Sequence, residues 1–305
     1  MNSMLLTSDC AKNCNESEGP GAASAGVTEL PESIGKLRNL KGLYTRNNRL
    51  RRLPETFGKL GNLARLNVSL NRLRRLPATI GALEQLEVFD ARWNSDLDGE
   101  IPGEFGMLQS LKSLKLTGTR ICALPTSFVQ LSRLELLVML SCDEVQEVPE
   151  LTASLSKLRI SPSSLKSFPD LSSMTNMVDL TLSNRRNPTI LTGKISEWIH
   201  HRQQKSSPML SLSTGMGRLS GLGHLQLSCP SPSHAVLPSG LGSLSLYHST
   251  SLSHWERLSN LDCLSTLQLR ESGATEIKLD GMESLKNLAY LVVCGCEFLE
   301  RIHDI

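Results

Sequence analysis

The residues with the clearest chemical character are arginines in a duplicated heptapeptide. Asn-Arg-Leu-Arg-Arg-Leu-Pro occurs at residues 48–54 and again at 71–77. Residues 35–75 hold twelve Lys and Arg and a single acid, Glu55, a local charge of +11 in a chain whose total is +2, so the remainder carries −9. Guanidinium groups bind carboxylates and phosphates and speed encounter with acidic partners. The heptapeptides therefore predict a basic flank that attracts an anionic surface, with a tolerated solvated edge as the alternative; its residues are Arg49, Arg51, Arg52, Arg72, Arg74 and Arg75.

Motifs for bond-making chemistry are missing from the sequence. The metalloprotease motif H-E-x-x-H, the nucleophile elbow G-x-S-x-G and paired C-x-x-C do not occur. The nearest match to a phosphate-binding loop, Gly193-Lys194, continues with Ile195 and has Pro188 where the first glycine belongs. Two adjacent histidines in 197–205 would point about 100° apart on a helix, which is a poor geometry for a shared metal. We expect no enzyme activity, no metal and no cofactor.

The pattern that must position the arginines is L-x-x-L-x-L-x-x-N. It starts every 23 residues in the first three units, with Asn48, Asn71 and Asn94 at its last position. About eleven units follow this register, within the period of roughly 20 to 29 residues expected for such repeats. Their first residues are Leu40, Leu63, Leu86, Leu111, Leu134, Leu155, Met177, Leu222, Leu241, Leu264 and Leu288.

Each L-x-L segment predicts a short strand whose leucines point inward and whose intervening residues face solvent. One unit cannot bury its own leucines, but stacked units can, which predicts a parallel sheet over a continuous aliphatic core. The second half of the early units reads L-P-x-x-I/F-G-x-L, where Pro is expected to start a helical turn and Gly to end it. The sequence therefore predicts an α/β leucine-rich-repeat solenoid, a horseshoe with the sheet on the concave face and short helices or 3-10 turns and loops on the convex face.

Composition changes along the chain. Residues 1–26 lack the basic start and apolar run of a signal peptide, are rich in Gly, Ala, Ser and Glu, and predict a disordered leader. Regular repeats are expected over 27–150 and irregular repeats over 151–305, with an insertion near 184–220 where the interval between strands is nearly two repeats. Eight scattered cysteines and the lack of an apolar run long enough for a membrane span predict a cytoplasmic chain, with the nucleus as the alternative.

The residues that flank the inward leucines are the expected recognition surface. In the first four units they are basic, polar and aromatic, of the kind favoured at protein interfaces, and the fifth unit adds an apolar strip. Trp93 is the strongest single candidate, with sideways packing against the next unit as the alternative. The predicted protein-binding residues of the concave face are Tyr44, Arg46, Arg65, Asn67, Asp90, Arg92, Trp93, Lys115, Leu136 and Val138.

These units resemble known repeat proteins of plants. Leu30-Pro-Glu-Ser-Ile-Gly-Lys-Leu at 30–37 is similar to plant Ras-group-related repeat proteins, and Leu288-x-x-Leu-x-Val-x-x-Cys296 resembles the terminal repeats of intracellular nucleotide-binding disease resistance proteins. Leu97-Asp-Gly-Glu-Ile-Pro102 looks like a variant common in plant repeats. The phosphate-binding loop of the resistance proteins' switch domain is not matched in this chain.

The resemblance implies a non-catalytic module of plant defence signalling whose partner is a protein. That partner would be a pathogen effector, a host target or a nucleotide-switch domain. The alternative is a cytosolic scaffold for a small GTPase or phosphatase complex. Binding of anionic lipid or nucleic acid through the basic flank is a minor alternative, because no stacking array or groove-reading helix accompanies the charge.

Overall fold

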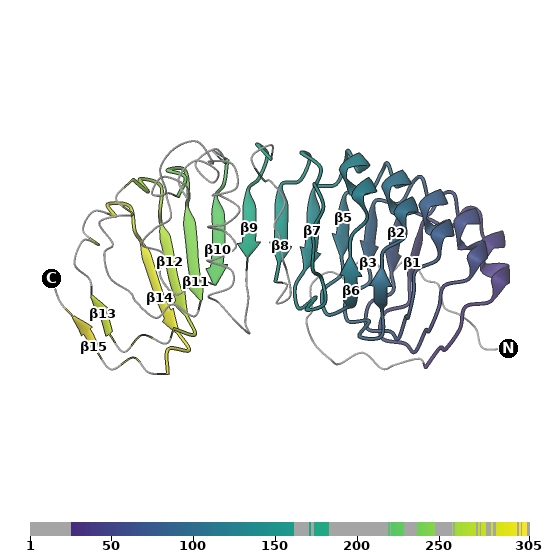
Figure 1. The fold of residues 1–305 in the computed structure, drawn as a ribbon, viewed down its shortest axis with the longest axis horizontal. Coiled ribbons are helices and arrows are strands. Elements are labelled where there is room, and N and C mark those ends of the chain that lie inside the picture. The colour runs from purple at the N-terminus through teal and green to yellow at the C-terminus, as the bar shows by residue number, and fades with distance from the viewer. Residues whose placement is uncertain are drawn as a thin grey trace. The chain divides into compact units, whose positions relative to one another are not determined.

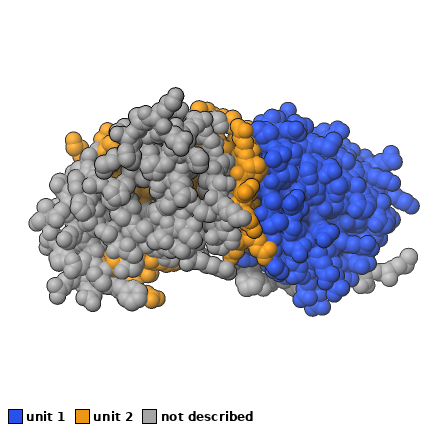
Figure 2. Space-filling model, in the orientation of Figure 1, with its two compact units in different colours: residues 1–134 blue, residues 135–305 orange. Residues whose placement is uncertain are grey.

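The computed structural model divides the chain into two compact units, residues 1–134 and 135–305 (Figure 2). The part that it describes comprises residues 26–161, 171, 174–182, 219, 221–228, 237–247, 258, 260–272, 274, 276–278, 282, 285–297, 299 and 301–303. The expected leader lies outside the described residues except for Gly26, and the expected insertion does so except for Leu219.

Unit 1 is built on a parallel sheet of three-residue strands. These are β1 (Gly42–Tyr44), β2 (Arg65–Asn67), β3 (Val88–Asp90) and β5 (Ser113–Lys115), paired in that order (Figure 1). The register joins the central residues of successive strands, Leu43, Leu66, Phe89 and Leu114, which are all buried. The predicted parallel sheet with inward-facing apolar residues is confirmed.

A 3-10 helix of five residues follows each Leu-Pro or Ile-Pro pair in unit 1. The helices are η2 (Glu32–Lys36), η3 (Glu55–Lys59), η4 (Ala78–Ala82), η5 (Gly103–Met107) and η6 (Thr126–Gln130), each directly preceded by a proline. Proline fixes φ and has no N–H to leave unpaired at the start of a helix. The third residue of every helix, Ile or Phe, is buried and closes the core. The predicted short turns opposite the sheet are confirmed.

The glycine of these helices does not end them, contrary to the sequence-based expectation. Gly58 lies inside η3, which continues to Lys59 and is capped by Leu60. A Cβ at Gly58 would stand 2.6 Å from the carbonyl oxygen of Thr79 in the next helix, closer than real atoms approach. Gly35 meets Thr56 in the same way, with its Cβ position 2.5 Å from the Thr56 oxygen. The glycine is needed because consecutive helices stack closely, not because the chain turns there.

The short sheet formed by β4 (Asp98–Glu100) and β6 (Arg120–Ala123) was not expected from the sequence. β4 lies in the L-x-G-x-I-P variant, where residues 94–102 are two more than the heptapeptide that they replace. β6 lies in the following repeat, in a segment of ordinary length. Glu100 aligns with Ala123 across an irregularity in the register.

The bends that follow β2 and β3 are each held by a buried asparagine. The Nδ2 group of Asn71 donates to the carbonyl oxygens of Thr45 at 2.8 Å and Val68 at 2.9 Å, and its Oδ1 accepts the Leu50 N–H at 3.0 Å. Asn94 repeats the arrangement one unit later, with Nδ2 on Val68 and Oδ1 on the Leu73 N–H. Each asparagine therefore joins its own repeat to the preceding one.

Unit 2 contains a parallel sheet of longer strands, each of four or five residues. These are β7 (Leu136–Met139), β8 (Lys157–Ile160), β9 (Asp179–Leu182), β10 (His224–Ser228), β11 (Ser243–Tyr247), β12 (Thr266–Arg270) and β14 (Tyr290–Cys294). A second pair joins β13 (Glu276–Lys278) and β15 (Arg301–His303). Asp179 of β9 aligns directly with His224 of β10, so the long interval between them does not interrupt the sheet. Among the described residues the repeat strands of the two units number eleven, in agreement with the predicted total of about eleven repeats.

The close stacking of the 3-10 helices gives a testable prediction. Gly58→Ala should lower the free energy of unfolding by about 1–3 kcal/mol, the usual cost of forcing a methyl group into packed space. Gly61→Ala is the matched control, because no atom lies within 4 Å of its Cβ position and its φ is not positive. Urea denaturation of both variants measures the difference, and equal effects would show that the helices are not packed as described.

Candidate functional site

The exposed face of the unit 1 sheet presents two rows of side chains. Register places Tyr44, Asn67, Asp90 and Lys115 side by side on successive strands. Two residues further along lie Arg46, Ser69, Arg92 and Thr117, where backbone hydrogen bonds continue beyond the strands, such as Trp93 N to Thr117 O at 2.7 Å. We call these residues, with Arg65 and Trp93, the exposed sheet face; within it Ser69, Asp90 and Thr117 are themselves buried. Side chains in such rows stand one strand spacing apart, about 4.8 Å.

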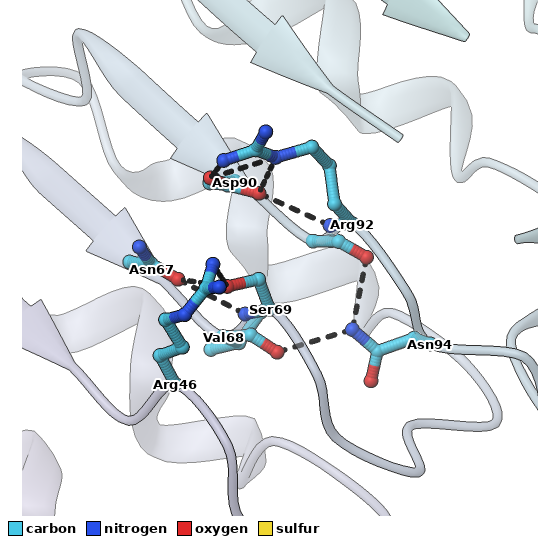
Figure 3. Close-up of polar contacts among 8 residues, drawn as sticks. Arg46, Asn67, Val68, Ser69, Asp90, Arg92 and Asn94 are labelled. Atoms are coloured by element: carbon cyan, nitrogen blue, oxygen red, sulfur yellow. Dashed lines mark hydrogen bonds and ion pairs between the residues drawn. The ribbon is translucent and has the colours of Figure 1, made fainter. Parts of the chain in front are cut away.

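Asp90 holds Arg92 in a fixed orientation (Figure 3). Arg92 donates from Nε to Asp90 Oδ1 at 3.0 Å and from Nη2 to Oδ2 at 2.8 Å, and the Arg92 N–H also donates to Oδ1 at 3.1 Å. The Asp90 side chain is only 7% exposed, whereas that of Arg92 is 26% exposed. The buried Asp90 thus orients the Arg92 guanidinium, and Arg92 is the group of the pair that reaches the surface.

Asn67 makes corresponding contacts with Ser69 one strand earlier. Its Oδ1 accepts from the Ser69 N–H at 3.0 Å and from the Ser69 hydroxyl at 2.7 Å, and Arg46 Nη1 donates to that hydroxyl at 3.4 Å (Figure 3). Ser69 was not among the residues expected from the sequence. The shared spacing of Asn67-x-Ser69 and Asp90-x-Arg92 is the signal that could have found it.

Trp93 lies sideways against the next repeat, which was the alternative expected for it. The atoms nearest to the Cβ position of Gly118 are those of the Trp93 six-membered ring, and no side chain could occupy that position without moving the ring. Trp93 still leaves 50% of its surface exposed. Its φ of 58° is left-handed, as are the φ of Asn47 and Leu70 at the same place in earlier repeats and that of Gly118 in the next.

The remaining expected residues differ in exposure. Arg65 is exposed, while Tyr44 and Lys115 are half-buried. In unit 2, Leu136 and Val138 are half-buried and alternate with the buried Leu137 and Met139 along β7. Both apolar side chains therefore stand on the solvent side of that strand.

The structure of unit 2 adds an ion pair that the sequence did not reveal. Arg159 of β8 donates from Nη2 to Asp179 Oδ2 of β9 at 2.6 Å, and from Nε at 3.2 Å. Asp179 is buried, and its Oδ1 accepts no hydrogen bond from the part of the chain that the structure describes. The two residues are twenty apart in sequence, so only the pairing of β8 with β9 brings them together.

The arginines of the basic flank lie in the two bends that lead from the sheet toward the 3-10 helices. Backbone hydrogen bonds align the two heptapeptides, from Arg72 N to Leu50 O at 2.9 Å and from Arg74 N to Arg51 O at 3.2 Å. All six side chains are exposed, and the leucines between them are buried. The two heptapeptides therefore run side by side in adjacent repeats.

Within the described ranges, no three His, Cys, Asp or Glu side chains gather as they would around a metal ion. No helix there is both long enough and apolar enough to cross a membrane.

Comparison with protein families decides the class. The family model described as "Leucine-rich repeat region" matches residues 21–98 and 93–303. The chain belongs to this leucine-rich repeat family. A curated relative, the TMV resistance protein N of Nicotiana glutinosa, is 27% identical over 165 residues, which cover 42% of this chain and 14% of the relative. The leucine-rich repeat chain thus spans about one seventh of that relative's length.

Solved structures share the fold at low sequence identity. The functional domain of InlJ from Listeria monocytogenes has a TM-score of 0.59 and 17% identity, over 90% of this chain and 53% of that one. An internalin, InlF, from the same organism has a TM-score of 0.53 and 17% identity, over 87% of this chain and 76% of that one. A chain of the Drosophila Toll–Spatzle complex has a TM-score of 0.51 and 18% identity, over 92% of this chain and 35% of that one. These likenesses establish the leucine-rich repeat fold alone.

The contact between Trp93 and Gly118 gives a prediction that fluorescence can check. In a Trp198→Phe/Trp255→Phe background, Gly118→Ala should shift Trp93 emission to the red, because the added methyl group displaces the indole into solvent. It should also cost roughly 1–2 kcal/mol of stability, since Gly118 has a left-handed backbone. Gly99→Ala is the control, because Gly99 has φ +77° but no atom within 4 Å of its Cβ position. Unchanged emission in Gly118→Ala would contradict the described packing.

Proposed function

We propose that the leucine-rich repeat chain is a non-catalytic recognition module whose exposed sheet face in unit 1 binds a protein partner. The observation that carries the proposal is the fixed orientation of Arg92 by the buried Asp90. A side chain that is already ordered does not lose roughly 0.5–1.5 kcal/mol of conformational freedom on binding. A chain that oriented its arginines only for solubility would have no need of this carboxylate.

The neighbouring groups favour a partner with carboxylates around an apolar contact. Arg46 and Arg65 add positive charge beside Arg92, and Trp93 offers a large half-exposed ring that packs sideways against Gly118. Arginine and tryptophan are the residues that most often dominate the binding energy of protein interfaces. The complementary surface would therefore present Asp or Glu side chains around one apolar group.

Plant defence signalling is the proposed context, with the chain acting in the cytoplasm. It is supported by the similarity to the TMV resistance protein N and by the resemblance of the terminal repeats to resistance proteins. In that context the partner is an effector, a host target or a nucleotide-switch domain. A partner that is captured only in one nucleotide state would instead favour the scaffold of a small GTPase complex.

The test combines capture from plant cell extract with a matched pair of charge reversals in the full chain. Arg46→Glu/Arg65→Glu reverses two charges on the exposed sheet face, and Lys36→Glu/Lys59→Glu reverses two on the 3-10 helices of the same repeats. The first variant should lose at least about tenfold in affinity for the captured partner, since close charge pairs couple by about 1.5 kcal/mol or more. The second should keep it.

A photo-crosslinking residue locates the contact independently of charge. Placed at Arg65, it should attach to the partner, whereas placed at Lys59 on η3 it should not. Equal losses in the two charge-reversed variants, or crosslinks only from position 59, would overturn the proposed binding face.

A further inference from the structure

The basic flank is a second charged surface, separate from the exposed sheet face. None of its six guanidinium groups pairs with a carboxylate of the described residues. The heptapeptides stand in adjacent repeats, so the backbone at each arginine of the first lies about one strand spacing, ~4.8 Å, from that at its like-charged counterpart in the second. Unpaired like charges at this spacing repel one another, and an anion placed over them removes that repulsion.

The arginines project from a rigid backbone. Leu50, Leu53, Leu73 and Leu76 alternate with them and are buried in the core. Asn71 binds the Leu50 N–H, and Arg74 N donates to the Arg51 carbonyl, so both bends are fixed on each side of the exposed guanidinium groups. The flank therefore presents its six arginines from a backbone whose positions are fixed by the repeats.

An acidic border limits the basic flank to two repeats. The third repeat replaces the arginines with Asp96, Asp98 and Glu100, which are all exposed. Asp98 is joined directly to the flank, because its N–H donates to the carbonyl oxygen of Arg74 at 3.2 Å. Positive charge therefore changes to negative charge within one repeat along the stack.

We propose that the basic flank docks an acidic polypeptide segment, a run of Asp and Glu that crosses the two heptapeptide repeats and ends in a basic residue over the acidic border. A narrow extended chain can lie on the six arginines alone. A membrane surface or a nucleic acid duplex is wider than two repeats and would press its own negative charge against Asp96, Asp98 and Glu100. The two heptapeptides also contain no aromatic residue, so the flank offers no ring on which nucleic acid bases could stack. Forked guanidinium groups suit carboxylates.

The experiment measures binding of a fluorescent oligoglutamate peptide to the full chain by anisotropy. Parallel arms use phosphatidylcholine vesicles that contain phosphatidylinositol bisphosphate and a random-sequence DNA duplex. The peptide should bind, its affinity should fall with rising salt, and Arg51→Gln/Arg74→Gln should weaken it roughly tenfold, the loss expected from two exposed charge pairs. Lys36→Gln/Lys59→Gln removes the same charge from the 3-10 helices and should leave the affinity unchanged.

The added basic residue and the acidic border provide a second comparison. A peptide that carries two lysines after the glutamates should bind more tightly than oligoglutamate alone, and Asp96→Asn/Asp98→Asn should abolish that gain. Absence of peptide binding, equal losses in the arginine and lysine variants, or tighter binding to vesicles or DNA than to the peptide would each overturn the proposal. None of these results bears on the exposed sheet face, because Arg46, Arg65 and Arg92 remain unchanged.

Discussion

The structure of unit 1 depends on how the chain bends inward after each strand. A bend in the interior leaves backbone N–H and carbonyl groups without ladder partners, and each buried group without a hydrogen bond costs about 1–3 kcal/mol. Asn71 satisfies the carbonyls of Thr45 and Val68 and the N–H of Leu50 with one side chain. Because its partners lie in two repeats, the same hydrogen bonds fix the bend and hold the two repeats together. At later bends Thr119 and Cys142 make the bond to their own repeat, and the sulfur contact of Cys142 is long, at 3.7 Å.

The recognition surfaces follow from that constraint. Once each bend is fixed, the residue before the asparagine takes a left-handed backbone, and Trp93 at this position turns its ring against Gly118. The residues one step before it, Ser69 and Arg92, are aligned by the continuing backbone hydrogen bonds. The residues beyond the asparagine carry the basic flank. Both charged surfaces of unit 1 therefore take their positions from the same row of bends.

The sequence predicted what the repeat period alone determines. Spacing of Leu43, Leu66 and Phe89 was enough to assign strands, their inward residues and their parallel register, and Asn48, Asn71 and Asn94 marked the bends. The sequence did not predict the contacts that depend on how closely neighbouring repeats approach one another. The glycines of the 3-10 helices were assigned to helix ends, whereas their packing against the next helix explains them, and β4 with β6 was missed. Asp90 was expected at the surface beside Arg92, but pairing and burial make it the support for that arginine.

Asn71→Ala in the full chain, unfolded by urea, tests most directly whether the bends hold the stack together. The account predicts a loss of about 2–4 kcal/mol in the free energy of unfolding, because the Thr45 and Val68 carbonyls and the Leu50 N–H lose their partner in the interior. Asn62→Ala is the matched comparison, since Asn62 makes one exposed hydrogen bond, to the Arg38 carbonyl at 2.8 Å, and its loss should cost no more than about 0.5 kcal/mol. Equal small effects of the two substitutions would contradict the account.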